Sequence, residues 1–335
     1  MSPSGRSLVR ASSSRILLVI GGFHRRCGRP CDHLRPRTAL IEINPHPARR
    51  CHSAGRNRRA MPMTIRDLIV YVDESAGDDS LIDVATGLAR RDGAQLTGIF
   101  PVPPMRLPLG YDPMMFEPLW QQWREEADLA AARCRERYEA RTAAAGVPGG
   151  WLVAAGGPDA AMLHARYVDL AVVARAKPET PDGTTVTAAD LAIDSGRPVL
   201  MVPPGRPAAV GRNAVVAWKP TREAVRAVND ALALLEPGAK LTILVVDPGD
   251  APDHGEEPGA DIAAHLARHG MEVTVEVASS GRLDPGATLL RRAAELGADL
   301  LVMGAYGHSR LRERVLGGVT RDILRTAPLP VLLAH

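Results

Sequence analysis

The chain carries one pattern of segments twice, and this internal repeat limits its fold more than any other feature of the sequence. Four segments of the first copy recur in the second copy, in the same order and with similar residues. The pairs are LIVYVDES (68–75) with AVVAWKPT (214–221), GAQLTGIF (93–100) with GAKLTILV (238–245), DLAVVARA (169–176) with DLLVMGAY (299–306), and RPVLMVP (197–203) with LPVLLAH (329–335). A repeat of this length predicts two similar structural units in one polypeptide.

Each copy alternates short β-branched runs with helix-patterned segments, which is typical of a parallel sheet covered by helices on both faces. Right-handed crossovers then give a doubly wound, Rossmann-like sheet of five parallel strands. We therefore predict an α/β fold with two tandem domains, 63–204 and 211–335, each with a five-stranded parallel sheet flanked by helices. The segment 203–212 is rich in proline and glycine and is the predicted linker. Because it is short, the two domains should lie close together.

Apolar residues at helical spacing indicate the core-facing sides of three helices. In the first copy they are Leu81, Val84, Ala85 and Leu88, and in the second copy Val225, Val228, Leu232 and Leu235. A long helix is predicted from about Phe116 to Ala145, with a stripe made of Leu119, Trp123, Ala127 and Ala131.

Residues 1–62 differ from the rest of the chain in charge. They hold 13 arginines and 2 acidic residues, whereas residues 63–335 hold 28 basic and 36 acidic side chains. We expect this basic extension to be disordered, or to be upstream sequence ahead of a start at Met61 or Met63. An organelle transit peptide also fits its composition, whereas arginines close behind the short run ILLVIGG argue against a secretory signal.

Composition also excludes several classes of partner and site. A mildly acidic body argues against a nucleic-acid surface, and no apolar run approaches the roughly 20 residues of a membrane span. Cys27, Cys31 and Cys51 lack the paired spacing of a zinc site, and Cys134 stands alone in the body, so no disulfide is expected there. We expect a cytoplasmic protein that binds neither nucleic acid nor membrane.

A glycine-rich segment, MGAYGHSRLRERVLGGVTRDIL (303–324), follows the predicted fourth strand of the second copy. Ligands of doubly wound sheets bind beyond the carboxyl ends of the strands. Gly304 and Gly307 would let the backbone turn and approach a bound group. Gly317 and Gly318 precede a helix start, whose free N–H groups attract phosphate. The segment predicts a phosphate cradle, although it is neither a Walker A loop nor a GxGxxG motif. The alternative that these glycines only mark turns and a helix start stays open.

The spacing Gly304-x2-Gly307-x9-Gly317 resembles the signature loop of the universal stress protein family. LIVYVDES, DLLVMGAYGHS and the terminal PVLLA extend the resemblance over residues 63–335, in the tandem form with two such domains. The resemblance implies that the loop glycines and the start of the next helix, Gly318 and Val319, hold the phosphates of ATP or AMP, with magnesium in the case of ATP.

The chain departs from the family pattern at both ends of this implied site. Gly318 stands where a Ser or Thr is expected, and Thr320 could replace that hydroxyl in part. Lys219 stands where the family has an acid after the first strand. The first copy keeps that acid as Asp73 but has lost the glycine spacing of the loop. We expect Asp73 to act as a turn or helix-cap acid.

Charged residues near the loop are further candidates for phosphate contacts. His308, Arg310 and Lys219 could each reach a phosphate, and each could instead be a solvent-exposed loop or turn residue. Arg312 and Arg314 extend the same basic stretch, which is often a solvated face of a helix or loop.

No catalytic motif is visible. The nucleophile elbow GxSxG, the zinc motif HExxH and paired carboxylates are absent, so we do not expect an enzyme. Two functions stay open: a stress-response protein whose second domain binds ATP or AMP, and a non-nucleotide scaffold of the same fold that acts through protein association. The family resemblance further implies that the two domains pair through their last strands. We also expect a homodimer and protein partners of unknown identity.

Overall fold

The computed structural model describes residues 64–74, 79–106, 116–177, 185–205, 210–248, 258–306 and 318–335. The chain divides into two compact units, residues 1–58 and 59–335. All described residues belong to the second unit. The expectations for the basic extension, residues 1–62, therefore lie outside the described residues.

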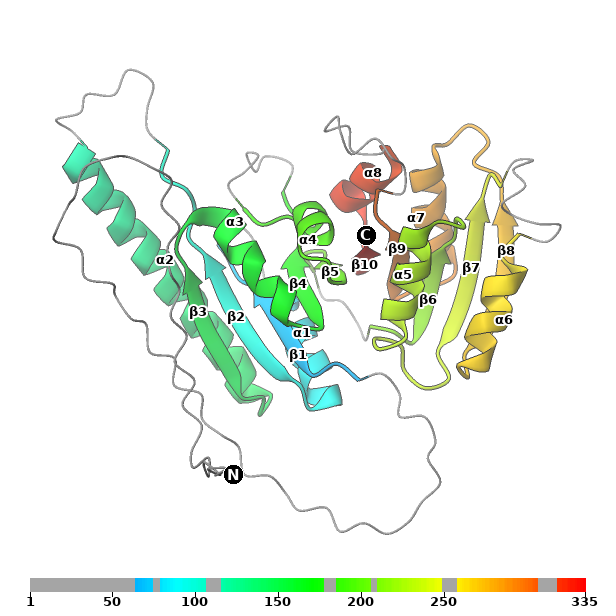
Figure 1. Cartoon of the computed structure of the whole chain (residues 1–335), viewed down its shortest axis with the longest axis horizontal. Coiled ribbons are helices and arrows are strands. Elements are labelled where there is room, and N and C mark those ends of the chain that lie inside the picture. Colours follow the sequence, from blue (N-terminus) through cyan, green and yellow to red (C-terminus); the bar gives the residue numbers. More distant parts are fainter. Residues whose placement is uncertain are drawn as a thin grey trace, which may run out of the picture. The chain divides into compact units, whose positions relative to one another are not determined.

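The first half of the second unit follows the predicted alternation of strands and helices (Figure 1). Its strands are β1 (Asp67–Tyr71), β2 (Gln95–Pro101), β3 (Gly149–Ala154), β4 (Leu170–Ala174) and β5 (Val199–Val202). Its helices are α1 (Ser80–Asp92), α2 (Phe116–Ala144), α3 (Gly157–Met162), the 3-10 helix η2 (Leu163–Tyr167) and α4 (Ala188–Asp194).

The second half repeats this order of elements. Its strands are β6 (Asn213–Ala217), β7 (Lys240–Val246), β8 (Glu272–Ala278), β9 (Leu300–Gly304) and β10 (Val331–Ala334). Its helices are α5 (Arg222–Ala231), α6 (Ala260–Arg268), α7 (Pro285–Glu295) and α8 (Gly318–Thr326).

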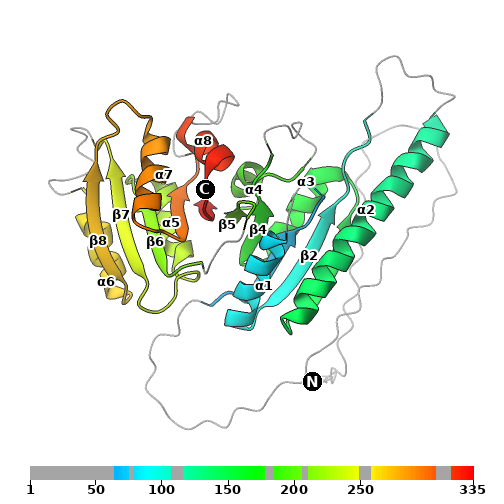
Figure 2. The same ribbon diagram turned by 180° about the vertical axis from the view of Figure 1, so that it is seen from behind.

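All of these strands form one sheet, in the order β3-β2-β1-β4-β5-β10-β9-β6-β7-β8. Neighbouring strands are parallel within each half, which confirms the doubly wound arrangement. At the junction β5 and β10 are antiparallel, and Leu200 pairs with Leu332. The expected pairing of the last strands is therefore confirmed, and it joins the two five-stranded sheets into one. β3 and β8 are the outer strands of the described sheet (Figure 1, Figure 2).

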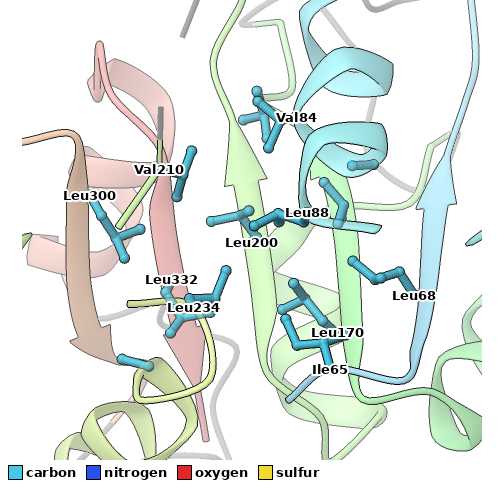
Figure 3. Close-up of a cluster of buried hydrophobic side chains, with 14 of the residues drawn as sticks. Ile65, Leu68, Val84, Leu88, Leu170, Leu200, Val210, Leu234, Leu300 and Leu332 are labelled. Carbon is cyan, nitrogen blue, oxygen red and sulfur yellow. The ribbon is translucent and has the colours of Figure 1, made fainter. Parts of the chain in front are cut away.

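The hydrophobic core runs across this junction on both faces of the sheet. On the face covered by α1 and α5, Leu68 and Leu200 of the first half belong to the same buried cluster as Leu332 of the second half (Figure 3). On the opposite face, Val199 and Val331 belong to a second shared cluster. Because burial of apolar surface is the main stabilising term in folding, separating the halves would expose both clusters to water.

The predicted core faces of α1 and α2 agree with the structure in their main parts. The α1 residues Leu81, Val84, Ala85 and Leu88 are buried. The stripe of α2 is buried at Ala127 and Ala131, but Leu119 and Trp123 are only half-buried. No described helix, α2 included, combines the length and apolar composition needed to cross a membrane.

The predicted core face of α5 is wrong in part. Val225 is 44% exposed, and α5 ends at Ala231, before Leu232 and Leu235. The buried residues of its inner face are the small ones, mainly Ala224, Ala227, Val228 and Ala231. Small side chains let α5 lie close against the sheet, which a search for large apolar residues does not detect.

Candidate functional site

The candidate site lies at the carboxyl ends of β6 and β9, where the strand order of the second half reverses. β6 has β7 on one side and β9 on the other. The connection through α5 leads from β6 to β7, and the connection through α8 leads from β9 to β10. Ligands of doubly wound sheets bind at such a reversal point. Lys219, Gly304 and the start of α8 at Gly318 all lie at this edge.

Gly304 has no room for a side chain because α5 packs directly on it. A Cβ on Gly304 would lie 2.5 Å from the amide nitrogen of Ala224 and 2.6 Å from the carbonyl carbon of Glu223. Both are backbone atoms of the first turn of α5, so no rotamer change relieves the clash. Gly304 therefore has a packing function that the sequence did not indicate. In the first half Ala174, the last residue of β4, holds the equivalent place.

The first turn of α5 is already occupied by the protein's own polar groups. The Thr221 hydroxyl accepts a hydrogen bond of 3.3 Å from the amide of Ala224. Glu223 is 4% exposed and forms an ion pair with Arg222. Burial raises the pKa of Glu223, but hydrogen bonds from Arg222, the main chain and Thr221 outweigh burial and lower it. A carboxylate thus already lies at the positive end of α5.

The helices α7 and α8 begin side by side at the same edge. A Cβ on Gly286, in the first turn of α7, would lie 3.6 Å from the carbonyl oxygen of Val319 and 3.7 Å from Ile323 of α8. The start of α7 is capped by Asp284, whose carboxylate accepts a hydrogen bond of 3.0 Å from the amide of Ala287. Two helix N-termini therefore converge here, and an internal carboxylate caps that of α7.

The first turn of α8 has no acidic residue. Each of the other described α-helices has an acid in its first turn or at its N-cap. These residues are Asp83, Glu117, Asp159, Asp190, Glu223, Asp261 and, at the N-cap of α7, Asp284. The first N–H groups of a helix lack intrahelical partners, and the helix dipole is positive at that end. Within the described chain, α8 is the helix start best suited to an external anion.

The structure places some of the predicted site residues at this edge of the sheet. Gly318 is exposed, Val319 is half-buried and packs on the core, and Thr320 is 7% exposed. Lys219 is exposed and follows β6. The other predicted site residues lie outside the described residues: Gly307, His308, Arg310 and Gly317, together with the neighbouring Arg312 and Arg314.

The equivalent helix start in the first half is blocked by its own residues. The Thr187 hydroxyl accepts a hydrogen bond of 3.2 Å from the amide of Asp190 and donates one of 2.6 Å to the Asp190 carboxylate. This reciprocal cap places a carboxylate at the N-terminus of α4. Asp73 follows β1, but Asp79 holds the N-cap position of α1, so Asp73 is not the cap of that helix. Its other expected function, as a turn acid, stays a prediction.

Tyr306 is a residue of this region that sequence analysis missed. Its φ of 60° lies in the left-handed region, which non-glycine residues rarely adopt. Its hydroxyl is buried and has no hydrogen-bond partner among the described residues. Burial raises the pKa of Tyr306, and the negative charge of Asp190 in α4 adds to the effect. The sequence feature that could have identified Tyr306 is its position as an aromatic residue between Gly304 and Gly307.

The part of the chain that the structure describes holds no group of three or more His, Cys, Asp or Glu side chains able to bind a metal ion.

Comparisons with known proteins connect this geometry to one family. Residues 211–335 match the model of the universal stress protein family. Universal stress protein Slr1230 of Synechocystis is 46% identical over 44 residues, a match that spans 13% of this chain and 15% of the length of that relative. The crystal structure of a universal stress protein from Archaeoglobus fulgidus covers 80% of this chain and 95% of its own, with 16% identity and a TM-score of 0.63. It supports the fold over both halves. A universal stress protein in complex with cAMP is 25% identical and covers 38% of this chain and 99% of its own, with a TM-score of 0.28.

Proposed function

Residues 211–335 belong to the universal stress protein family, and from this premise we propose that the second half of the chain binds the phosphates of ATP or AMP at the start of α8. Magnesium would accompany ATP. The protein would act as a cytoplasmic stress-response protein without dedicated catalysis, and bound nucleotide would change its stability or the surface that it offers to partners.

The absence of an acid from the first turn of α8 is the observation that carries the proposal. The amides of Gly318, Val319 and Thr320 belong to the first turn, where N–H groups have no carbonyl partner in the helix. At α5 and α7, which also start at this edge, and at α4, the equivalent start in the first half, a carboxylate of the protein lies at the positive end. A phosphate at α8 would supply the missing negative charge.

The reversal point of the sheet supports the same position. α8 starts on the connection between β9 and β10, and β9 borders β6 at the reversal. A nucleotide with phosphates at α8 could extend its nucleoside toward the end of β6, where Trp218 and Lys219 lie. Since Lys219 replaces the acid of the family pattern, we propose that the phosphates contribute more to affinity than the ribose does.

Gly318 offers a sharp test because its surroundings are open. It is exposed, and no atom of the described residues lies within 4 Å of a Cβ built on it. Gly318→Glu would place a carboxylate in the first turn of α8, as the other helices have, whereas Gly318→Gln has nearly the same shape without the charge. Thermal unfolding is measured with increasing ATP and magnesium, and separately with AMP.

The wild type should gain about 2.7 kcal/mol of stability when ligand reaches 100 times its dissociation constant. Gly318→Gln should bind within about threefold of the wild type, because a neutral side chain leaves the dipole uncompensated. Gly318→Glu should bind at least about tenfold more weakly, through repulsion of the phosphates. Equal binding by both variants would place the ligand elsewhere. No stabilisation of the wild type by either nucleotide would favour the scaffold function.

A further inference from the structure

β8 is an outer strand of the described sheet, and no other described strand pairs with its outer edge. It is last in the strand order and pairs with β7 along its whole length, from Glu272 to Ala278. Both views show it at the margin of the described strands (Figure 1, Figure 2). Edge strands usually carry lysine, proline or a bulge, which prevents pairing with other chains. The β8 sequence, EVTVEVA, contains neither lysine nor proline, and its charged residues are Glu272 and Glu276, of which Glu276 pairs with Arg292 of α7.

The main-chain groups of Val273, Val275 and Val277 point outward from this edge. The amide of Glu272 donates to the carbonyl of Ala239, and the carbonyl of Ala278 accepts from the amide of Asp247. The even-numbered residues of β8 therefore direct their main chain toward β7. Because direction alternates along a strand, the three valines direct N–H and C=O groups away from the sheet.

The same valines form an apolar strip that α6 covers only in part. They are in register with Leu241, Ile243 and Val245 of β7, which are buried. Yet Val275 is 38% exposed and Val277 is 54% exposed. The turn before α6 lies over Val275, since a Cβ on Gly259 would approach its Cγ1 to 3.2 Å. A helix of nine residues spans about 14 Å, whereas seven strand residues span about 23 Å.

We propose that β8 pairs antiparallel with β8 of a second copy of this chain, with Val275 opposite its counterpart. Val275 is the middle residue of β8, so this register is a twofold-symmetric one. Val273 then faces the partner's Val277, and each outward-pointing residue meets another. Such pairs exchange both N–H···O=C bonds. The unpaired edge groups of the three valines would all be satisfied.

The charges of β8 favour this register over its neighbours. With Val275 on the axis, Glu272 faces the partner's Ala278 and Thr274 faces the partner's Glu276. A shift of two residues in one direction would place Glu272 opposite the partner's Glu276. The opposite shift would place the two Glu276 residues opposite each other. Like charges directly opposite are destabilising. Of these three registers, only the one centred on Val275 keeps the glutamates of the two copies from facing each other.

The edge of β8 suits pairing with a second copy better than the edge of β3, the other outer strand of the described sheet. β3 begins with Gly149 and Gly150, which weaken a strand, and it offers no sequence symmetry about its centre. The β5–β10 junction is buried inside one chain and is not available for association. The proposal does not depend on nucleotide binding, because β8 is neither β6 nor β9, the strands that border the candidate site.

Sedimentation velocity on the full chain, over a concentration series, tests the proposal. Wild type should show a monomer–dimer equilibrium. Val275→Lys places two lysines opposite each other on the axis and should raise the dimer dissociation constant at least about tenfold. Thr274→Lys places a lysine opposite the partner's Glu276 on both sides of the axis and should lower that constant about threefold. Val153→Lys, at a 43% exposed valine of β3, is the matched control and should leave it unchanged.

A second measurement uses only the wild type, so its result does not depend on whether Val275→Lys folds. Hydrogen exchange of the wild type should slow at the amides of Val273, Val275 and Val277 as protein concentration rises. The amides of Thr274 and Glu276 should be protected at every concentration by β7. The proposal is overturned if wild type remains monomeric, if the two lysine variants of β8 weaken association equally, or if exchange of the three valine amides does not depend on concentration.

Discussion

Leu200 of β5 lies directly opposite Leu332 of β10, and the two residues hold the same position in the two halves of the chain. Each is the second residue of its strand, and each is fully buried. Equivalent residues that face one another are the mark of a twofold-symmetric interface between identical subunits. Here one chain forms such an interface between its own halves, so the association does not depend on protein concentration.

The leucine pair should be energetically coupled. Leu200→Ala and Leu332→Ala should each lower the free energy of unfolding by about 2–5 kcal/mol, because each leaves a cavity in the core. The double variant should lose less than the sum, by about 0.5–3 kcal/mol, since the residues are in contact. Urea unfolding provides the measurement. Leu96 of β2 is fully buried but away from the junction. Leu96→Ala combined with Leu332→Ala is therefore the control pair, whose effects should add. Additivity for the Leu200–Leu332 pair would contradict a shared core.

Gly304→Ala should destabilise the protein whether or not nucleotide is present. Its added methyl group would meet the main chain of α5 at 2.5 Å, and such overpacking costs about 1–3 kcal/mol. Gly318→Ala is the control, because no described residue lies within 4 Å of a Cβ at Gly318 and alanine favours helix. Thermal unfolding in the absence of ligand distinguishes the two. A Gly304→Ala protein as stable as the wild type would show that α5 does not pack this closely on β9.

The stability that Asp79 provides should depend on pH. Burial raises the pKa of Asp79, but hydrogen bonds and charges of Arg137 and Arg141 outweigh burial and lower the pKa. A carboxyl group with a lowered folded-state pKa stabilises the protein above its unfolded pKa of about 4, and this contribution is lost as pH falls through the folded value. Asp79→Asn should therefore cost about 1–3 kcal/mol at pH 7 and much less near pH 3.

Urea unfolding at the two pH values measures this difference. Glu74→Gln is the control, because Glu74 forms an exposed pair with Arg133 and surface pairs contribute little. A constant penalty for Asp79→Asn at both pH values would show that its charge does not stabilise the fold.

Cys134 should be protected from alkylation in the folded protein. It is fully buried in α2, and burial raises the pKa of its thiol to about 11. Iodoacetamide reacts with the thiolate, so at pH 8 the folded chain should leave Cys134 unmodified and the chain in guanidinium chloride should not. Peptide mass mapping reads each cysteine separately. Alkylation of Cys134 in the folded protein at the rate of a free thiol would show that this part of α2 opens readily.

The sequence by itself determined the repeated α/β architecture, because the period of apolar residues distinguishes strands from helices wherever one face must be buried. It also indicated that α8 begins after a glycine-rich segment, whereas the pairing of the last strands was expected only from the family resemblance. It misplaced the inner face of α5 at Val225, because close packing there uses alanines, which give a weak apolar signal.

Only the tertiary structure decided what surrounds each residue. The clash of Gly304 with α5 and the position of Tyr306 near Asp190 involve residues far apart in the chain. The caps on α4, α5 and α7 join residues only three positions apart, but which helix starts lie near the candidate site depends on the fold. The edge of β8 likewise became visible only once the strand order was known. Local sequence fixes which element a segment forms, because backbone preferences and periodicity act over a few residues. Contacts between elements arise from how the whole chain folds, and no short-range pattern records them.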